Sequence, residues 1–199
     1  PTSNLRLRSG IAPLPLFHRA GTTVAMGLDS STLNDDSDML QEIRLAANLQ
    51  RVPGASGGMV PVKEIFKMAT VKGMKLLRWS DIAGTLEPGK QADLVLLDSR
   101  DFALPYLAPR QNPIDTLVYR GKSTAVDTVM VGGEILYQGK KHKRINPKTI
   151  HKRLKASIEP PSPKNTEGPE AELLPHVRAP FDSWDQDKTV PFHKFNSIE

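Results

Sequence analysis

The 199-residue sequence contains no cysteine, which excludes disulfides, thiolate metal ligands and cysteine nucleophiles. No apolar run approaches the length of about 18 residues that a membrane-spanning helix needs, so no membrane segment is expected. The first residues, Pro1 to Leu7, include neither an initiator methionine nor the apolar region of a signal peptide. We therefore expect a piece of a longer cytoplasmic protein whose N-terminal part precedes residue 1.

Metal-binding histidine motifs are also absent. The five histidines show neither the His-x-His nor the His-Glu-x-x-His spacing, so the sequence encodes no complete metal site. Lys90 follows Pro88-Gly89 as in a phosphate-binding loop, but the first glycine and the Ser or Thr for magnesium are missing. We interpret that stretch as a β-turn.

Positive charge is abundant in one segment, whereas acid is missing from it. The net charge is +5. Between Gln138 and Lys155 there are eight basic residues and no acid: Lys140, Lys141, Lys143, Arg144, Lys148, Lys152, Arg153 and Lys155. Such a cluster can bind phosphate backbones, but no aromatic residue lies between the charges as in single-strand binders. A solvated helix face and a basic turn are the preferred interpretation, and no nucleic-acid partner is expected.

Hydrophobic periodicity predicts helices near the N-terminus and short strands after residue 82. The expected helices are 13–20, 36–50 (capped by Asp36 or Ser37), 61–77 and 147–157 (capped by Asn146). The expected strands are 22–27, 92–97, 116–119, 126–131 and 134–137, the last two forming a hairpin through Gly132-Gly133. The helix–strand–helix order indicates βα units and a parallel sheet. Residues 53–58 are expected to be a flexible break.

Asp29 is the main candidate for chemistry. It follows the apolar segment Val24–Met26 and Gly27, and a polar loop and an amphipathic helix follow it. A barrel strand presents a catalytic or metal-binding acid in this way, and such a carboxylate can ligate a divalent cation or act as a general base. Alternatively, Asp29 caps the loop or the helix after it. Ser3-Asn4 and Ser9-Gly10 indicate a second polar loop, which either places an amide or hydroxyl near a substrate or caps helix 13–20.

Several segments together resemble one known family. Residues 1–13 (PTSNLRLRSGIAP) resemble the loop after barrel strand 7 of the amidohydrolase superfamily, in its cytosine deaminase-like branch of aminohydrolases and chlorohydrolases. Gly27-Leu-Asp29, Asn34 and the helix from Asp38 resemble strand 8 and its following helix. Residues 69–73 and 84–98 resemble the passage from barrel to β-sandwich, and Val129–Gly133 the final sandwich strands. The segments occur in family order.

This resemblance implies a role for each matching residue. Asp29 corresponds to the aspartate that binds the metal and shuttles the proton of its water. Ser30 and Asn34 would lie beside the substrate, and Ser3 and Asn4 would flank the site. The implied cofactor is a divalent metal, zinc with iron as the alternative, and the implied substrate is a small heterocyclic amine. The histidine ligands of the family all precede residue 1, and Ser30 stands where many deaminases have glycine.

The expected fold class is α/β: the C-terminal part of a (β/α)8 TIM-like barrel with part of a composite β-sandwich. Residues 1–80 would form the last βα units, 81–140 the sandwich portion, 141–158 a basic helix and 159–199 a Pro-rich extended tail. Expected partners are the N-terminal part of the same protein and further copies in a homo-oligomer. The rival hypothesis is a non-catalytic relative that uses the scaffold for oligomerisation or partner binding.

Overall fold

The computed structural model describes residues 1–51, 59–158, 172–176 and 179. It divides into one unit that comprises residues 1–144 and a second that begins at Ile145, and each is described by itself. The expected break at 53–58 lies outside the described residues, as does the expected tail apart from the helical residues 172–176 and Ala179. In the described part of the chain, no helix is both long and apolar enough to cross a membrane.

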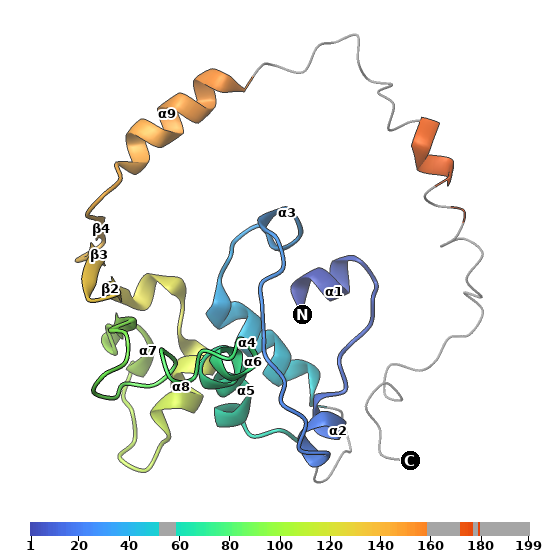
Figure 1. The fold of residues 1–199 in the computed structure, drawn as a ribbon, viewed down its shortest axis with the longest axis vertical. Coiled ribbons are helices and arrows are strands. Elements are labelled where there is room, and N and C mark those ends of the chain that lie inside the picture. Colours follow the sequence, from blue (N-terminus) through green and yellow to red (C-terminus); the bar gives the residue numbers. More distant parts are fainter. Residues whose placement is uncertain (52–58, 159–171, 177–178, 180–199) are drawn as a thin grey trace. The chain divides into compact units, whose positions relative to one another are not determined.

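The first unit is an α/β assembly of short helices beside a small sheet (Figure 1). Its helices are α1 (Thr2–Arg6), α2 (Leu14–Arg19), α3 (Ser31–Asn34), α4 (Met39–Leu49), α5 (Val62–Met68), α6 (Val71–Leu76), α7 (Arg100–Ala103) and α8 (Pro113–Arg120). Its strands are β1 (Leu94–Leu97), β2 (Val126–Val131), β3 (Glu134–Gln138) and β4 (Lys141–His142), with the 3-10 turn η1 (Ser123–Ala125) before β2.

The predicted hairpin is confirmed. The sheet is antiparallel throughout, in the order β1-β2-β3-β4, with Leu94 opposite Met130 and Val129 opposite Tyr137. Gly132 and Gly133 join β2 to β3 with φ angles of 57° and 82°, which glycine adopts without a steric penalty. The turn before β1 is confirmed too, because the Lys90 amide donates to the Glu87 carbonyl at 3.2 Å.

Two strand predictions are wrong. Residues 116–119 belong to α8, which begins at Asn112-Pro113: the Asn112 side-chain oxygen accepts from the Ile114 amide at 2.9 Å, and Pro113 suits the first helical position. Residues 22–27 form no ladder, because none of the described strands pairs with them. The Met26 amide instead donates to the Met68 carbonyl at 3.0 Å. The predicted parallel sheet is therefore absent from the described residues.

Two helix boundaries also differ from the prediction. Helix α4 is capped by Asp38 rather than by Asp36 or Ser37, since the Asp38 carboxylate accepts from the amides of Leu40 and Gln41. The helix predicted over 61–77 is divided into α5 and α6 at Thr70, whose φ of −131° and ψ of −104° are not helical. The Thr70 hydroxyl donates to the Phe66 carbonyl, a bond of the kind that competes with the helical ladder.

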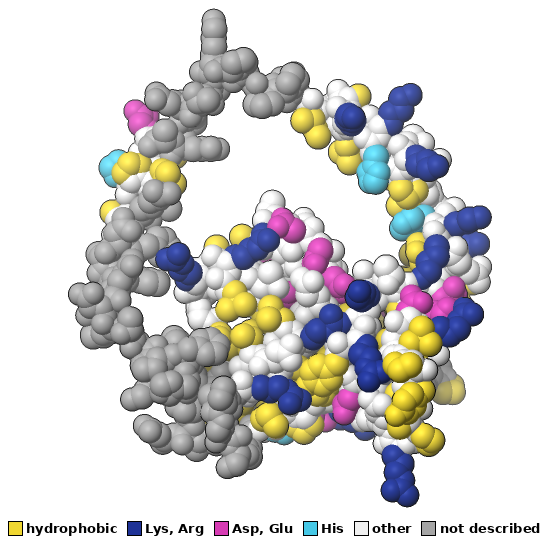
Figure 2. Space-filling model, turned by 180° about the vertical axis from the view of Figure 1, so that it is seen from behind, with side chains coloured by type: hydrophobic (Ala, Val, Ile, Leu, Met, Phe, Trp, Pro, Cys, Tyr) yellow, Lys and Arg dark blue, Asp and Glu magenta, His cyan; other side chains and the backbone are white. Residues whose placement is uncertain are grey.

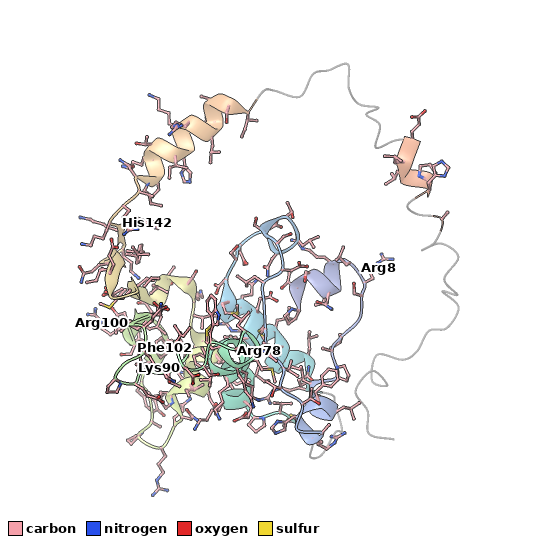
Figure 3. All side chains as sticks on the ribbon, in the orientation of Figure 1. Arg8, Arg78, Lys90, Arg100, Phe102 and His142 are labelled. Atoms are coloured by element: carbon pink, nitrogen blue, oxygen red, sulfur yellow. The ribbon has the colours of Figure 1, made fainter. Side chains whose placement is uncertain are left out.

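The main core joins α2, α4, α5 and α8. Its buried members are Leu14, Ile43, Ala46, Ala47, Val60, Ile65, Met68 and Val118. Arg44 fixes α4 to the end of α8, because its guanidinium donates to the carbonyls of Val118 (2.8 Å) and Gly121. Position 121 must be glycine here, since a Cβ would come within 2.5 Å of the Leu117 carbonyl oxygen. A smaller cluster of Phe102, Leu117 and Ala125 packs between α7, α8 and η1, and Figure 3 labels Phe102.

The second unit contains α9 (Pro147–Ser157), with the bounds and the Asn146 cap that the sequence predicted. All of its side chains are exposed, and basic, histidine and apolar side chains occur along its length (Figure 2).

Truncating Ile43 to alanine should destabilise the first unit by about 2–5 kcal/mol, because the side chain is 2 % exposed and leaves a cavity among packed neighbours. Ile150→Ala on α9 is the matched control: its side chain is 39 % exposed, and the change should stay within about 0.5 kcal/mol. Urea unfolding of both variants measures this difference, and equal losses would contradict the assigned core.

Glu64 provides a test by pH. Hydrogen bonds from Lys67 (2.7 Å) and Lys72 (2.9 Å) lower its pKa from 4.5 to about 2, despite partial burial. Because the folded-state pKa is depressed, the stabilisation is complete above about pH 4.5 and is lost as the pH falls toward 2. In Glu64→Gln, the unfolding free energy should fall by roughly 1 kcal/mol less than in the wild type as the pH is lowered through this range. The expected difference is this small because solvent partly screens the lysines. An acid dependence of unfolding that is the same in Glu64→Gln and in the wild type would contradict the assigned role of Glu64.

Candidate functional site

Asp29 lies at the end of the irregular segment 22–28, just before α3. Its φ angle of 68° is left-handed, a region that aspartate enters more readily than most residues. The carboxylate is exposed, and in the described part of the chain it has no hydrogen-bond or ion-pair partner. Neither neighbouring helix uses it as a cap, because Ser30 is the N-cap residue of α3 and Asp38 that of α4. Its carboxylate is therefore available to a ligand.

Asn34 fixes the backbone just before Asp29. Its side chain is buried at 3 % exposure, and its Nδ2 donates to the Leu28 carbonyl at 3.2 Å. This bond links residues 28 and 34, and it fixes the peptide unit directly before Asp29. The other amide atom, Oδ1, is buried with no partner among the described residues. Ser30, by contrast, is exposed, and its hydroxyl lies 2.6 Å from that of Thr32.

Ser3 and Asn4 lie on a helix rather than in the polar loop that the sequence predicted. Both belong to α1, which lies beside α3 and above α4 in Figure 1. Ser3 is buried and Asn4 is exposed. The Arg6 guanidinium at the end of α1 forms an ion pair with Asp35 at 2.6 Å, just after α3. The structure thus brings the two predicted segments, 1–6 and 29–38, into contact.

Glu42 is a buried acid at this contact, and sequence reasoning missed it. Its carboxylate on α4 accepts from the Thr2 amide at 3.0 Å and from the Thr2 hydroxyl. The signal was its position: Glu42 falls on the apolar stripe, three residues after Met39 and four before Ala46.

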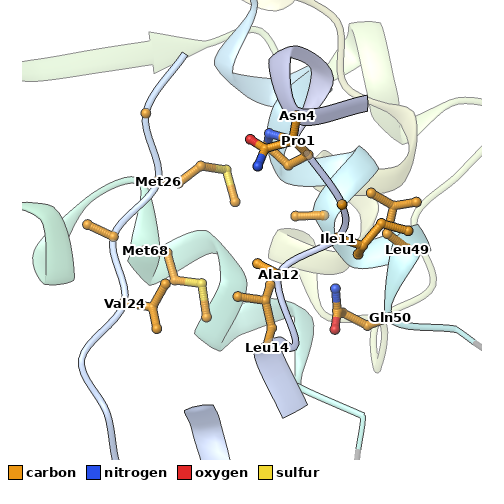
Figure 4. A pocket seen from close by; sticks show the side chains of 14 residues that line it. Pro1, Asn4, Ile11, Ala12, Leu14, Val24, Met26, Leu49, Gln50 and Met68 are labelled. Carbon is orange, nitrogen blue, oxygen red and sulfur yellow. The ribbon is translucent and has the colours of Figure 1, made fainter. Parts of the chain in front are cut away.

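A pocket of about 190 Å³ lies along the segment that leads to Asp29 (Figure 4). Leu14, Val24, Met26 and Met68 give it an apolar lining, and Asn4 reaches it from α1. Gln50 adds an amide whose buried Oε1 has no partner among the described residues. Asp29, Ser30 and Asn34 do not line this pocket, so of the predicted site residues only Asn4 faces it.

The described residues do not form a metal centre by themselves. Among them, no three or more His, Cys, Asp or Glu residues lie close enough to hold an ion, whereas a zinc site takes three or four protein ligands. His142 lies on β4 against the Tyr137 ring, away from α3 (Figure 3). His18 is exposed on α2, and His193 lies outside the described residues. Asp29 can therefore supply one ligand of a site that needs others.

Comparisons with known proteins agree on one family. Residues 1–136 match the Amidohydrolase family. The chain is 36 % identical over 151 residues to a 5-methylthioadenosine/S-adenosylhomocysteine deaminase of Caldanaerobacter subterraneus, covering 76 % of this chain and 34 % of that protein. It is 38 % identical over 136 residues to a 5'-deoxyadenosine deaminase of Methanothermobacter thermautotrophicus, covering 68 % and 31 %. The chain thus spans about a third of the length of these relatives.

Solved structures give the same result. An adenosine deaminase from Xanthomonas campestris with bound zinc superposes with a TM-score of 0.71 at 28 % identity, covering 78 % of this chain and 35 % of that one. An atrazine chlorohydrolase from Arthrobacter aurescens, also complexed with zinc, gives a TM-score of 0.69 at 27 % identity, covering 78 % and 34 %.

Proposed function

The chain belongs to the amidohydrolase family, and on this premise we propose that it is the C-terminal part of a metal-dependent aminohydrolase. Its substrate would be a small heterocyclic amine, of the adenosine-like class for which its relatives are named. Residues 1–80 would complete a (β/α)8 barrel whose strands lie in the part that precedes residue 1, with segment 22–27 pairing as a strand only in that context, and 81–140 would belong to a β-sandwich. The short antiparallel sheet β1–β4 supports the second assignment.

The proposal rests mainly on the carboxylate of Asp29, which has no partner among the described residues. This carboxylate is exposed and caps neither adjacent helix. The peptide unit before Asp29 is held by a hydrogen bond from the buried side chain of Asn34. A structural aspartate in a strand-to-helix turn normally accepts hydrogen bonds from backbone amides. Asp29 accepts none among the described residues, which suits a residue whose partner is a metal or a substrate.

The proposed chemistry is hydrolysis of a ring carbon–nitrogen bond. A zinc ion, or iron as the alternative, would supply a water molecule of lowered pKa, with Asp29 as one ligand and histidines outside this chain as the others. Asp29 would take one proton of the attacking water and return it to the amino nitrogen, so that the carbon–nitrogen bond breaks and ammonia leaves.

Four further residues are proposed to orient the substrate. Asn4 and Ser3 would act from α1, and Ser30 and Asn34 from the loop after Asp29. The contact between these segments supports this placement, as does the position of Asn4 at the apolar pocket. An aromatic heterocycle suits such a lining, because apolar walls bury its rings while a few polar groups fix its orientation.

Exposed apolar side chains support the proposed contact with the N-terminal part or with further copies. Between α6 and β1 they follow one another closely: Leu76, Leu77, Trp79, Ile82 and Leu86. Leu86 is 78 % exposed. A concentration of this kind commonly marks a surface that another polypeptide covers.

Asp29→Asn in the full-length protein should lower kcat for ammonia release by about 100- to 10,000-fold, because the amide cannot carry the proton. The assay is ammonia release over purines, pyrimidines, pterins and triazines, with metal content measured on the same samples. Asp81→Asn, an exposed turn residue, is the matched control and should retain full turnover. Unchanged activity in Asp29→Asn would refute the assignment, and a wild type with neither metal nor turnover would favour the non-catalytic scaffold.

A further inference from the structure

Glu42 is a buried acid that the proposed chemistry does not use. It is 1 % exposed and lies next to Ile43 on the core face of α4. Removing a carboxylate from water is costly unless its oxygens are paired. The partners of Glu42 therefore indicate what the residue is for.

Those partners belong to α1. Oε2 accepts from the Thr2 amide at 3.0 Å and Oε1 accepts from the Thr2 hydroxyl, so both carboxylate oxygens hold the same residue. Thr2 directly precedes Ser3 and Asn4, whereas α4 is the next helix after Asp29 and α3, which ends at Asn34. One buried carboxylate thus joins the two segments of the candidate site.

The second connection between these segments is much weaker. Arg6 and Asp35 form an ion pair at 2.6 Å, but their side chains are exposed and the pair is screened by water and salt. Hydrogen bonds to a buried charge are stronger than such an exposed pair. Glu42 therefore dominates the placement of α1 against α4.

We propose that Glu42 is a positioning residue: it holds α1 through Thr2, so that Ser3 and Asn4 stand at a fixed distance from Asp29. This inference rests on the proposed function, because it assigns substrate contacts to Ser3 and Asn4. Loss of the connection leaves Asp29 in place and moves the substrate-binding side chains. The expected kinetic signature is a higher KM with a smaller change in kcat.

The experiment compares Glu42→Met with Glu42→Gln in the zinc-loaded full-length protein, with 5'-deoxyadenosine as substrate. Methionine fills a similar volume but accepts nothing from Thr2, so KM should rise by about tenfold or more, as for a lost bond to a charged group. Glutamine can accept from the Thr2 amide and donate to its hydroxyl, so KM should remain within about twofold of wild type. Glu64→Met, which removes a paired carboxylate from α5, should leave KM unchanged.

Amide hydrogen exchange of residues 2–6 provides a readout that needs no turnover. Glu42→Met should speed exchange in α1 by about tenfold while α4 stays protected. Thr2→Val, which leaves the core of α4 intact, should also speed amide exchange in α1, but to a smaller extent. Thr2→Ser keeps the hydroxyl, so exchange in α1 should be as slow as in the wild type. Unchanged exchange in α1, or an unchanged KM in an active enzyme, overturns the positioning role. A wild type that protects α1 through Glu42 yet never releases ammonia refutes the proposed function instead.

Discussion

Helix α4 has to bury an apolar face and also pair every polar group that the same face removes from water. Ile43, Ala46 and Ala47 provide the apolar contacts of the main core. Glu42 and Arg44 flank Ile43, and each forms hydrogen bonds with a different segment: Glu42 with α1, and Arg44 with the end of α8. An unpaired buried charge would cost more than most single contacts contribute, so the pairing restricts where α1 and α8 can lie. These two side chains therefore connect α1 and α8 to α4.

Elements with local signals could be predicted from the sequence. The bounds of helix α9 are predictable because Asn146-Pro147 marks its start. The β2–β3 hairpin is predictable because Gly132-Gly133 permits positive φ. The same Asn-Pro signal stands before α8 at Asn112-Pro113, but the β-branched residues Thr116 and Val118 favoured a strand. Both of those side chains are buried in the structure, which shows that tertiary packing outweighed propensity.

The candidate site was partly predictable for a related reason. Asp29 could be singled out because an acid after an apolar run and a glycine is a local pattern. The bond from Asn34 to Leu28 and the pairing of Glu42 with Thr2 could not be predicted, because they join residues that lie 6 and 40 positions apart in the sequence. The strand expected at 22–27 failed for a long-range reason too. A strand exists only with a neighbour to pair with, and no described strand lies beside this segment.

The bond from the Asn34 side chain to the Leu28 carbonyl closes a ring through the backbone. A ring of this kind has a fixed number of members, so one added or deleted residue between positions 28 and 34 would leave Asn34 unable to reach its acceptor. Exposed positions such as Ser30, Ser31 and Thr32 can change identity without altering that count. Divergence in substrate preference among proteins with this loop should therefore arise by exchange of side chains at constant loop length, rather than by insertion.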